Sequence, residues 1–284
     1  MTERLADITA RIDGVRQLGA VVNAIRGIAA TRARQARDEL VAVDSYAATI
    51  ATAIRRALEA NSAPRSEDAR RSGRAALVVF CAEQGFAGAF SERVLDFVGA
   101  ERAPHELFLV GARGASLAAE RGVAAAWKIG MPPHTLGIPR LADRIAEALY
   151  RNLAAGRIDR LEAIFTQWRP ALGASVARRA LFPLDLTAFP PATGAVAPLL
   201  NLAPEALLRD LAAEYVHAQL CNAALHAFAA ESEARMEAMA AARRHIEREL
   251  AALEATQRSV RQEEITAEII ELAAGETASR ADAR

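Results

Sequence analysis

The sequence has few of the residues that would indicate a disulfide-stapled, metal-binding or nucleic-acid-binding protein. Two cysteines, Cys81 and Cys221, cannot build a disulfide framework, and no CxxC pair or Cys/His cluster suggests a metal site. The 35 basic and 35 acidic residues cancel, whereas a nucleic-acid binder is normally basic. Aromatic residues make up only 5%, so much of the 52% apolar content is alanine, the best helix former. These absences favour a helix-rich protein with two reduced, packed thiols.

The sequence also lacks segments that would insert into a membrane. The first twelve residues, MTERLADITARI, mix acids with bases and contain no apolar core of the kind found in secretory signals. No apolar run approaches the roughly 18 residues of a membrane-spanning helix. We therefore expect a soluble chain, which could still dock onto a membrane complex.

Proline is absent from the first sixty residues, and the apolar residues there follow a helical pattern. One position in every seven is apolar without a break, which is the pattern of a coiled-coil seam. Three glycines each weaken this helix by about 1 kcal/mol relative to alanine, a loss that a long seam can absorb. The seam positions are Ile8, Val15, Val22, Ala29, Ala36, Val43 and Ile50.

A second long helix is expected near the other end of the chain, because residues 205–274 contain neither glycine nor proline. Pro204 suits the start of a helix and Gly275 its end. At 1.5 Å per residue an unbroken helix here would be about 105 Å long, far more than a compact domain of this size needs. Two helices of this kind are stable when they pack on each other, and antiparallel pairing follows if the segment between them begins and ends at neighbouring points.

The middle of the chain has a different pattern, in which short apolar runs alternate with amphipathic helices. Strands are expected at 75–80, 106–110, 160–168 and 176–184, and a helix at 141–156. This alternation is typical of a parallel α/β sheet covered by helices. The predicted fold is thus a long antiparallel coiled coil with an inserted, Rossmann-like parallel α/β domain. The expected parts are an N-terminal helix (1–60), a linker (61–74), the α/β domain (75–190), a connector or foot (191–203), a C-terminal helix (204–275) and a flexible tail (276–284).

Several stretches of this chain, in the expected order, resemble the gamma subunit of F-type ATP synthases. AVVNAIRGIAATRARQA is similar to that family's N-terminal motif, and LVVFCAEQGFAGAF and LVGARG are similar to its first two strands with their turns. EARMEAM and RQEEITAEIIELAAG resemble its two C-terminal signatures at the family's spacing. The departures, among them Ala87 for the turn cysteine and Arg258 for an asparagine, indicate a divergent branch, with the alternate ATPases of some bacteria as a candidate.

The resemblance implies a role as the central rotor shaft, without a catalytic site of its own. In that family the shaft passes through a ring of alpha and beta subunits, contacts the epsilon subunit, and rests on the membrane c-ring. Ion flow turns the ring, and the asymmetric shaft forces each beta subunit through its conformations, which is coupling by differential affinity. The implied location is peripheral, on the cytoplasmic face of the bacterial cell membrane. The resemblance implies no cofactor, and no nucleic-acid partner is expected.

The resemblance also implies which residues contact the beta subunit. Near the N-terminus, five arginines fall between Gly14 and Arg37 with no acid among them, and in the family a basic band here meets an acidic loop of beta. Without the family, a solvated helix face is the preferred interpretation of this band. Near the C-terminus, the apolar side chains of Ile265, Ile269 and Leu272 would either form a bearing surface or pack on the N-terminal helix. The implied beta contacts are Ile25, Arg26, Arg32, Arg34, Arg235, Arg261, Gln262, Thr266 and Glu268; the weaker c-ring contacts are Leu200, Asn201 and Glu205.

Glycines at strand ends raise the alternative of a nucleotide site. GFAGAF, however, is not GxGxxG, no acidic residue follows a second strand at the required distance, and no Walker motif occurs. Tight turns account for Gly85, Gly88, Gly111 and Gly114, and the five histidines show no metal-ligand spacing.

Three hypotheses remain at this point: a rotor subunit, a free-standing enzyme or sensor built on the α/β domain, and a coiled-coil scaffold. The Arg-Gln-x-x-Ile-Thr signature favours the first, because neither alternative needs it at that place. A rotor subunit should occur once per three beta chains, whereas the alternatives predict an independent homodimer.

Overall fold

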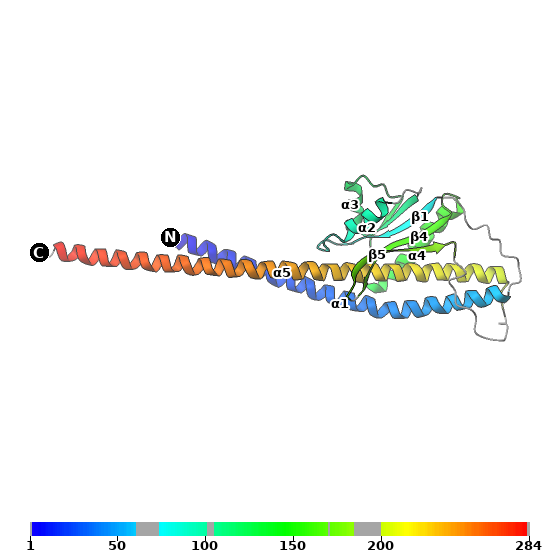
Figure 1. Ribbon diagram of the computed structural model, residues 1–284, viewed down its shortest axis with the longest axis horizontal. Helices are drawn as coiled ribbons and strands as arrows, with labels where there is room; N and C mark the ends of the chain where they lie inside the picture. Colours follow the sequence, from blue (N-terminus) through cyan, green and yellow to red (C-terminus); the bar gives the residue numbers. More distant parts are fainter. Residues whose placement is uncertain (1, 61–73, 101–104, 170, 185–199, 283–284) are drawn as a thin grey trace. The chain divides into compact units, whose positions relative to one another are not determined.

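The computed structural model describes residues 2–60, 74–100, 105–169, 171–184 and 200–282 (Figure 1). The chain divides into two compact units. The terminal unit consists of residues 1–28 and 237–284, and the central unit of residues 29–236. Two long helices, α1 (Thr2–Ala60) and α5 (Pro204–Asp282), contribute to both units.

Within the terminal unit, α1 and α5 lie side by side and antiparallel. Arg4 lies 4.0 Å from Glu263 in an ion pair, and Thr9 accepts a hydrogen bond of 2.9 Å from Gln257. A Cβ atom on Gly19 would lie 3.4 Å from Ile246, so the two helices come close there. As the residue number on α1 rises, the number of its partner on α5 falls.

The side chains between these two helices are apolar. Val22, Met239 and Ile246 are buried, and Val15 and Leu250 pack against them. The expected heptad positions all lie on the covered side of α1: Val22, Ala29, Ala36 and Ile50 are buried, and Ile8, Val15 and Val43 are half-buried. The sequence pattern therefore identified the covered face of α1 correctly.

The central unit contains a five-stranded sheet in the order β3-β2-β1-β4-β5. Neighbouring strands are parallel except for β4 and β5, which are antiparallel. The strands are β1 (Ala75–Phe80), β2 (His105–Val110), β3 (Trp127–Ile129), β4 (Arg160–Arg169) and β5 (Gly173–Phe182).

The expectation of a wholly parallel sheet was therefore wrong at its last strand. Residues 170–172 alone separate β4 from β5, whereas a parallel connection needs a crossover of about a dozen residues or more. Ala171 has φ 66° and Gly173 has φ 74°, which is the left-handed backbone of a tight turn. The chain can therefore only return as a hairpin.

Helices cover both faces of the sheet. On β1, alternate side chains point to opposite faces, as a strand requires. Leu77 and Val79 pack in the cluster that holds α2 (Phe90–Gly99) and α3 (Ala112–Glu120). Val78 and Phe80 pack in the larger cluster with α4 (Ile138–Ala154) and the middle of α5. The central unit thus has a three-layer core with α5 built into one outer layer.

Polar side chains also connect α5 to its neighbours in the central unit. The Asn222 amide donates to Asp44 on α1, and Arg179 on β5 donates to both Gln219 and Asn222 on α5. Arg37 on α1 forms an ion pair with the buried Glu233 on α5. These bonds satisfy polar groups that would be costly to bury alone.

The helix ends differ in part from the prediction. Gly275 does not stop α5, which continues to Asp282 through the first seven residues of the expected tail. One glycine costs a helix only about 1 kcal/mol relative to alanine, and the residues after it include good helix formers. The expected linker at 61–74 and connector at 191–203 fall mainly outside the described residues.

Candidate functional site

The turn that follows β1, residues 81–89, is held by a carboxylate from α5. The backbone N–H groups of Glu83 and Gln84 both donate to the side chain of Glu231, at 3.1 and 3.2 Å. This turn lies at the carboxyl end of β1, the central strand of the order β3-β2-β1-β4-β5. In open α/β sheets that edge is the usual place for a ligand.

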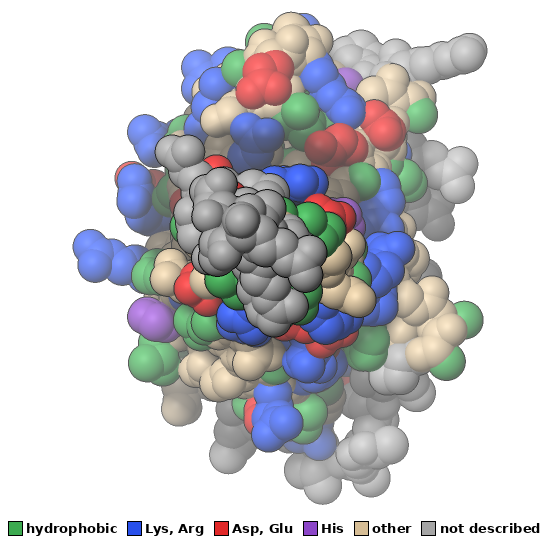
Figure 2. Space-filling view, turned by 90° about the vertical axis from the view of Figure 1, so that its left-hand side faces the viewer, with side chains coloured by type: hydrophobic (Ala, Val, Ile, Leu, Met, Phe, Trp, Pro, Cys, Tyr) green, Lys and Arg blue, Asp and Glu red, His purple; other side chains and the backbone are tan. Residues whose placement is uncertain are grey.

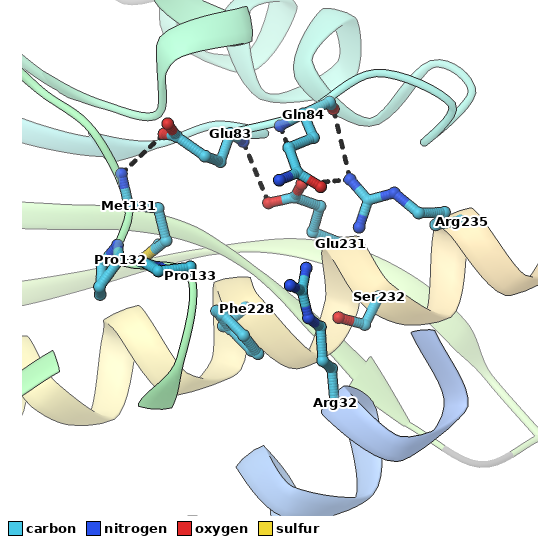
Figure 3. Close-up of a pocket in the computed structure, with 10 residues that line it drawn as sticks. All are labelled: Arg32, Glu83, Gln84, Met131, Pro132, Pro133, Phe228, Glu231, Ser232 and Arg235. Atoms are coloured by element: carbon cyan, nitrogen blue, oxygen red, sulfur yellow. Dashed lines mark hydrogen bonds and ion pairs between the residues drawn. The ribbon is translucent and has the colours of Figure 1, made fainter. Parts of the chain in front are cut away.

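The charge of Glu231 is balanced by Arg235, one helical turn further along α5 (Figure 3). The Arg235 guanidinium forms an ion pair with Glu231 and also donates to the carbonyl oxygens of Gly85 and Gln84, at 3.2 and 3.4 Å. Glu231 is 5% exposed and Arg235 is 6% exposed. A buried ion pair of this kind requires such additional hydrogen bonds to offset desolvation.

A second carboxylate, that of Glu83, extends the connection across the edge of the sheet. It accepts hydrogen bonds from the N–H of Ala112, at the start of α3, and from the N–H of Met131, just after β3, at 2.9 and 2.7 Å. A Cβ atom on Gly130 would lie 3.2 Å from the same carboxylate, so glycine leaves it room. The carboxyl ends of β1, β2 and β3 are therefore joined by one side chain.

The space left at this edge is small. A cavity of about 20 Å³ is lined by Arg32 from α1, by Phe228 and Ser232 from α5, by Pro132 and Pro133, and by the residues of the carboxylate network (Figure 3). That volume suits about one water molecule. The N–H groups of Glu83 and Gln84, which would be the donors to a phosphate, already bind the carboxylate of Glu231. This agrees with the interpretation of the glycines here as turn residues.

The two cysteines are buried among apolar side chains. Burial raises the pKa of the Cys81 thiol to about 12, and burial likewise raises the pKa of Cys221 to about 12. A thiol of that pKa is almost wholly protonated at neutral pH and is a poor nucleophile or metal ligand. Within the described ranges, no group of three or more His, Cys, Asp or Glu side chains could hold a metal ion.

The predicted contact residues on α1 have different surroundings. Arg26 and Arg34 are exposed, and neither forms an ion pair with any described residue, whereas Ile25 and Arg32 are half-buried. The predicted basic band is also interrupted, because Arg16 pairs with Glu254 at 2.9 Å. In Figure 2, Lys and Arg side chains are interspersed with acidic ones.

On α5, the predicted contact residues divide into two groups. Arg235 is buried in the turn contacts described above, so its guanidinium is engaged within the chain. The other four are exposed on the last turns of the helix: Arg261, Gln262, Thr266 and Glu268.

The apolar side chains near these four residues are exposed as well. Ile265 is 51% exposed, Ile269 61% and Leu272 75%. Within the terminal unit, Arg4 near the start of α1 pairs with Glu263, and the three apolar residues follow Glu263 on α5. These exposures do not agree with packing on the N-terminal helix, and the bearing surface stays a prediction.

The predicted foot residues lie before and at the start of α5. Asn201 and Glu205 are exposed, while Leu200 is half-buried. Leu200 lines a groove of about 440 Å³ together with residues from both long helices: Thr49, Thr52, Ala53, Arg56, Ala57, Leu207 and Leu211.

Glu83, Glu231 and Glu233 were not predicted from the sequence. A signal was present for two of them. Glu231 and Glu233 are the only charged residues between residues 218 and 234 apart from a histidine, in an alanine-rich and mostly apolar stretch of α5. Charged residues in such a stretch are expected to have buried partners.

Comparisons with known proteins agree in one assignment. The ATP synthase family model matches residues 4–278. The relatives it resembles carry the name ATP synthase gamma chain, including one from Bdellovibrio bacteriovorus that is 26% identical over 95% of this chain and 97% of its own length. The chain belongs to the ATP synthase gamma-chain family.

A further gamma chain, from Anaeromyxobacter dehalogenans, is 29% identical over 95% of this chain and 98% of its own. Among solved structures, the fold is similar to a chain of the Euglena gracilis mitochondrial ATP synthase rotor, with a TM-score of 0.67 and 14% identity over 93% of this chain and 100% of that one. A chain of the Tetrahymena thermophila central stalk and c-ring gives a TM-score of 0.55 and 18% identity over 78% of this chain and 99% of that one. At these identities, the solved structures support the gamma-chain fold alone.

Proposed function

We propose that this chain is the central rotor shaft of an F-type ATP synthase and a non-catalytic subunit of it. The observation that carries the proposal is the family match over residues 4–278. The structural neighbours are named as a rotor, an F1 and c-ring assembly, and a central stalk with its c-ring. We take the partners of this chain to be of the same kind: the alpha and beta subunits, the epsilon subunit and the c-ring.

The physical basis of coupling is an asymmetric shaft inside a ring of binding sites. A shaft face that binds one conformation of beta more tightly than another shifts the beta subunit toward that conformation. Turning the shaft presents the same face to each beta subunit in succession, so rotation and the nucleotide affinity of each site are linked reciprocally. The shaft needs no bond-making group for this work.

The shaft itself is assigned to α1 and α5 acting together as one long antiparallel coiled coil. The pairs Arg4–Glu263 and Thr9–Gln257 in the terminal unit support this assignment, as does Asp44–Asn222 in the central unit. The remaining part of the central unit is assigned to a Rossmann-like insertion between the two helices. The proposed boundaries are 1–60 for the N-terminal helix, 75–190 for the insertion and 204–275 for the C-terminal helix, and α5 itself extends to Asp282.

The contacts with beta are assigned to two regions. On α1, the exposed guanidiniums of Arg26 and Arg34 suit an acidic loop, because arginine donates two parallel hydrogen bonds to a carboxylate. Ile25, Arg32 and Arg235 are also assigned to the contact with beta. Ile25 and Arg32 are half-buried and Arg235 is buried, so each offers less surface to a partner. On α5 the contacts are assigned to four exposed residues: Arg261, Gln262, Thr266 and Glu268.

The foot is assigned to the segment that leads into α5. Asn201 and Glu205 are exposed and suit polar contacts with the c-ring, and Leu200 lies in the groove between the two long helices. In the described part of the chain, no helix is apolar over a stretch long enough to cross a membrane. As a gamma chain it belongs to the F1 part, and we propose a peripheral position at the cytoplasmic face of a bacterial membrane.

The experiment that tests the shaft assignment is deletion of residues 261–284 in the assembled complex. We expect ATP-driven ion pumping to fall steeply, because the exposed contact residues at the end of α5 are removed. The central unit should stay folded, since its contacts lie within residues 29–236. The measurements are pumping in reconstituted vesicles and limited proteolysis of the assembled complex.

A matched control replaces the exposed pair Arg243 and Glu247 on α5 with alanine, which removes an ion pair outside the proposed contacts. That variant should pump normally. Pumping that survives the deletion at the wild-type rate would contradict the assignment of the shaft tip. The purified complex should also contain one copy of this chain per three beta chains, and a separate homodimer would contradict the rotor role itself.

A further inference from the structure

The turn after β1 has the geometry of an anion-binding loop. Two successive N–H groups, of Glu83 and Gln84, point at the same carboxylate. Backbone N–H groups that converge in this way form a nest, a common binding site for anions such as phosphate. The nest lies at the edge of the sheet where open α/β proteins bind ligands.

In this chain the anion in the nest is part of the protein. Glu231 comes from α5, 147 and 148 residues away in sequence from its two donors. Its side chain is 7% exposed, so little water competes for its oxygens. Arg235 supplies the counter-charge and at the same time binds the carbonyl groups of Gln84 and Gly85.

The same turn contains a strained residue, next to the two residues whose carbonyl groups bind Arg235. Phe86 has φ 62°, in the left-handed region that costs a non-glycine residue about 1 kcal/mol or more. Its side chain is 70% exposed, so packing of the ring contributes little to holding this conformation. The hydrogen bonds to Gln84 and Gly85, immediately before it, therefore contribute to holding this conformation.

The effect of Glu231 reaches beyond the turn through Glu83. The Glu83 N–H binds Glu231, while the Glu83 carboxylate binds the N–H groups of Ala112 and Met131. A chain of hydrogen bonds thus runs from α5 to the turn after β1 and on to the carboxyl ends of β2 and β3.

We propose that Glu231 is a built-in anion that occupies the nest and acts as a positioning residue, fixing the carboxyl edge of the sheet to α5. The inserted sheet then follows α5 as one body, because its edge is bonded to the helix through the turn after β1. The proposal goes beyond the rotor assignment, since it concerns how α5 holds the inserted sheet rather than what the shaft contacts.

The test is hydrogen exchange by mass spectrometry on the full chain in its assembled complex, with Glu231→Gln and Glu231→Ala. We expect peptides covering residues 82–86 to exchange about tenfold faster in Glu231→Ala, because hydrogen bonds to a charged acceptor are lost. Glu231→Gln keeps a neutral acceptor of similar shape and should give a smaller increase. The peptide covering β4 should be unchanged in both variants.

Inorganic phosphate provides the second arm of the test. Added to Glu231→Ala, it should slow exchange of residues 82–86 toward the wild-type rate, because it can enter the emptied nest beside Arg235. Sodium chloride at the same ionic strength should not do so. Wild-type exchange should not respond to phosphate, because Glu231 already fills the nest.

Glu237→Ala is the matched control, since Glu237 is an exposed acid on the same helix. It should leave the exchange of residues 82–86 as in the wild type.

Unaltered exchange in both Glu231 variants would overturn the positioning role. An increase in Glu231→Gln that extends equally to β4 would also overturn it, because the effect would then be general destabilisation. Failure of phosphate to slow exchange in Glu231→Ala would overturn the assignment of the turn as an anion nest. None of these readouts depends on rotation, so they are independent of the rotor proposal.

Discussion

At the scale of single residues, one glycine of the central unit lies so close to a cysteine that it leaves no room for a side chain. A Cβ atom on Gly114 would lie 2.0 Å from the Cβ of Cys81, which no side chain can tolerate. The N–H of Gly114 also donates to Ala82 at 3.0 Å, so α3 is held directly against the end of β1. The glycine is required for this approach of two backbones.

Gly114→Ala should therefore destabilise the central unit by about 2–3 kcal/mol, because the added methyl group forces α3 away from β1. Gly99→Ala is the control, because a Cβ there meets nothing within 4 Å and its backbone is helical. Urea unfolding should show a lower midpoint for the first variant and no loss for the second. Equal midpoints would contradict the packing at this contact.

The two thiols offer another test at the residue scale. Because burial raises the pKa of Cys81 and of Cys221 to about 12, only a very small fraction of either is thiolate at pH 8. We expect alkylation by iodoacetamide to be at least tenfold slower in the native chain than in urea, where a thiol has its ordinary pKa of about 8.5. Mass spectrometry of the alkylated peptides measures both rates, and fast labelling of the native chain would show that the thiols are accessible.

At the scale of elements, the helices and strands were predictable where the pattern was long. The heptad of α1 and the glycine-free and proline-free stretch of α5 determine both helices, because a periodic apolar face repeats over many turns. β3, with only the three residues Trp127–Ile129, was missed because it is too short to show a period. The direction of β5 is set by the three residues between β4 and β5, which are too few for the crossover of a parallel pair. The apolar pattern of the strand does not show its direction.

The contact between α1 and α5 in the terminal unit combines a buried apolar seam with exposed ion pairs, and the seam should contribute most of the stability. Ile246, which is 6% exposed, packs on Val22 and Met239, so Ile246→Ala should cost about 2–4 kcal/mol. Arg16→Ala should cost less than about 1 kcal/mol, because both partners of the Arg16–Glu254 pair are largely exposed.

Thermal unfolding, followed by circular dichroism at low and high salt, separates the two contributions. The Arg16 variant should approach the wild type as salt screens the pair, while the deficit of the Ile246 variant should persist. A larger loss for Arg16→Ala than for Ile246→Ala would mean that charge, and not burial, holds these helices together.

At the scale of the whole molecule, stability should depend on pH through a buried histidine. His226 on α5 stacks on Phe165 of β4, with ring centroids 5.7 Å apart. Burial lowers the pKa of His226, and the nearby Arg179 lowers it further. As the pH falls, His226 of the unfolded chain takes up a proton near pH 6.5, whereas His226 of the native chain does so only at lower pH. Folding stability is therefore lost as the pH falls below about 6.5.

His226→Phe keeps the stacked ring and removes the proton site. We expect its free energy of unfolding to fall less steeply than that of the wild type between about pH 6.5 and pH 5. Urea titrations at several pH values measure this slope. A variant with the wild-type slope would assign the acid sensitivity to other groups.

Much of this molecule could be predicted from its sequence, but the carboxylate network could not. The apolar pattern identified the two long helices and four of the five strands, because each depends on neighbours close in sequence. The contact of Glu231 with Glu83 joins residues 148 positions apart, and no local pattern encodes it. The predicted contacts of Arg26, Arg34 and the end of α5 stay predictions, because they depend on surfaces that other chains supply.

The exposed isoleucines and leucine on the last turns of α5 have a consequence for how a cell must produce this protein. A chain released before its surrounding ring is available presents four large aliphatic side chains to water, those of Ile265, Ile269, Ile270 and Leu272, a feature that chaperones and degradative proteases recognise. Synthesis in step with the ring subunits would keep this lifetime short. An excess of this chain over its partners should therefore be cleared rather than stored.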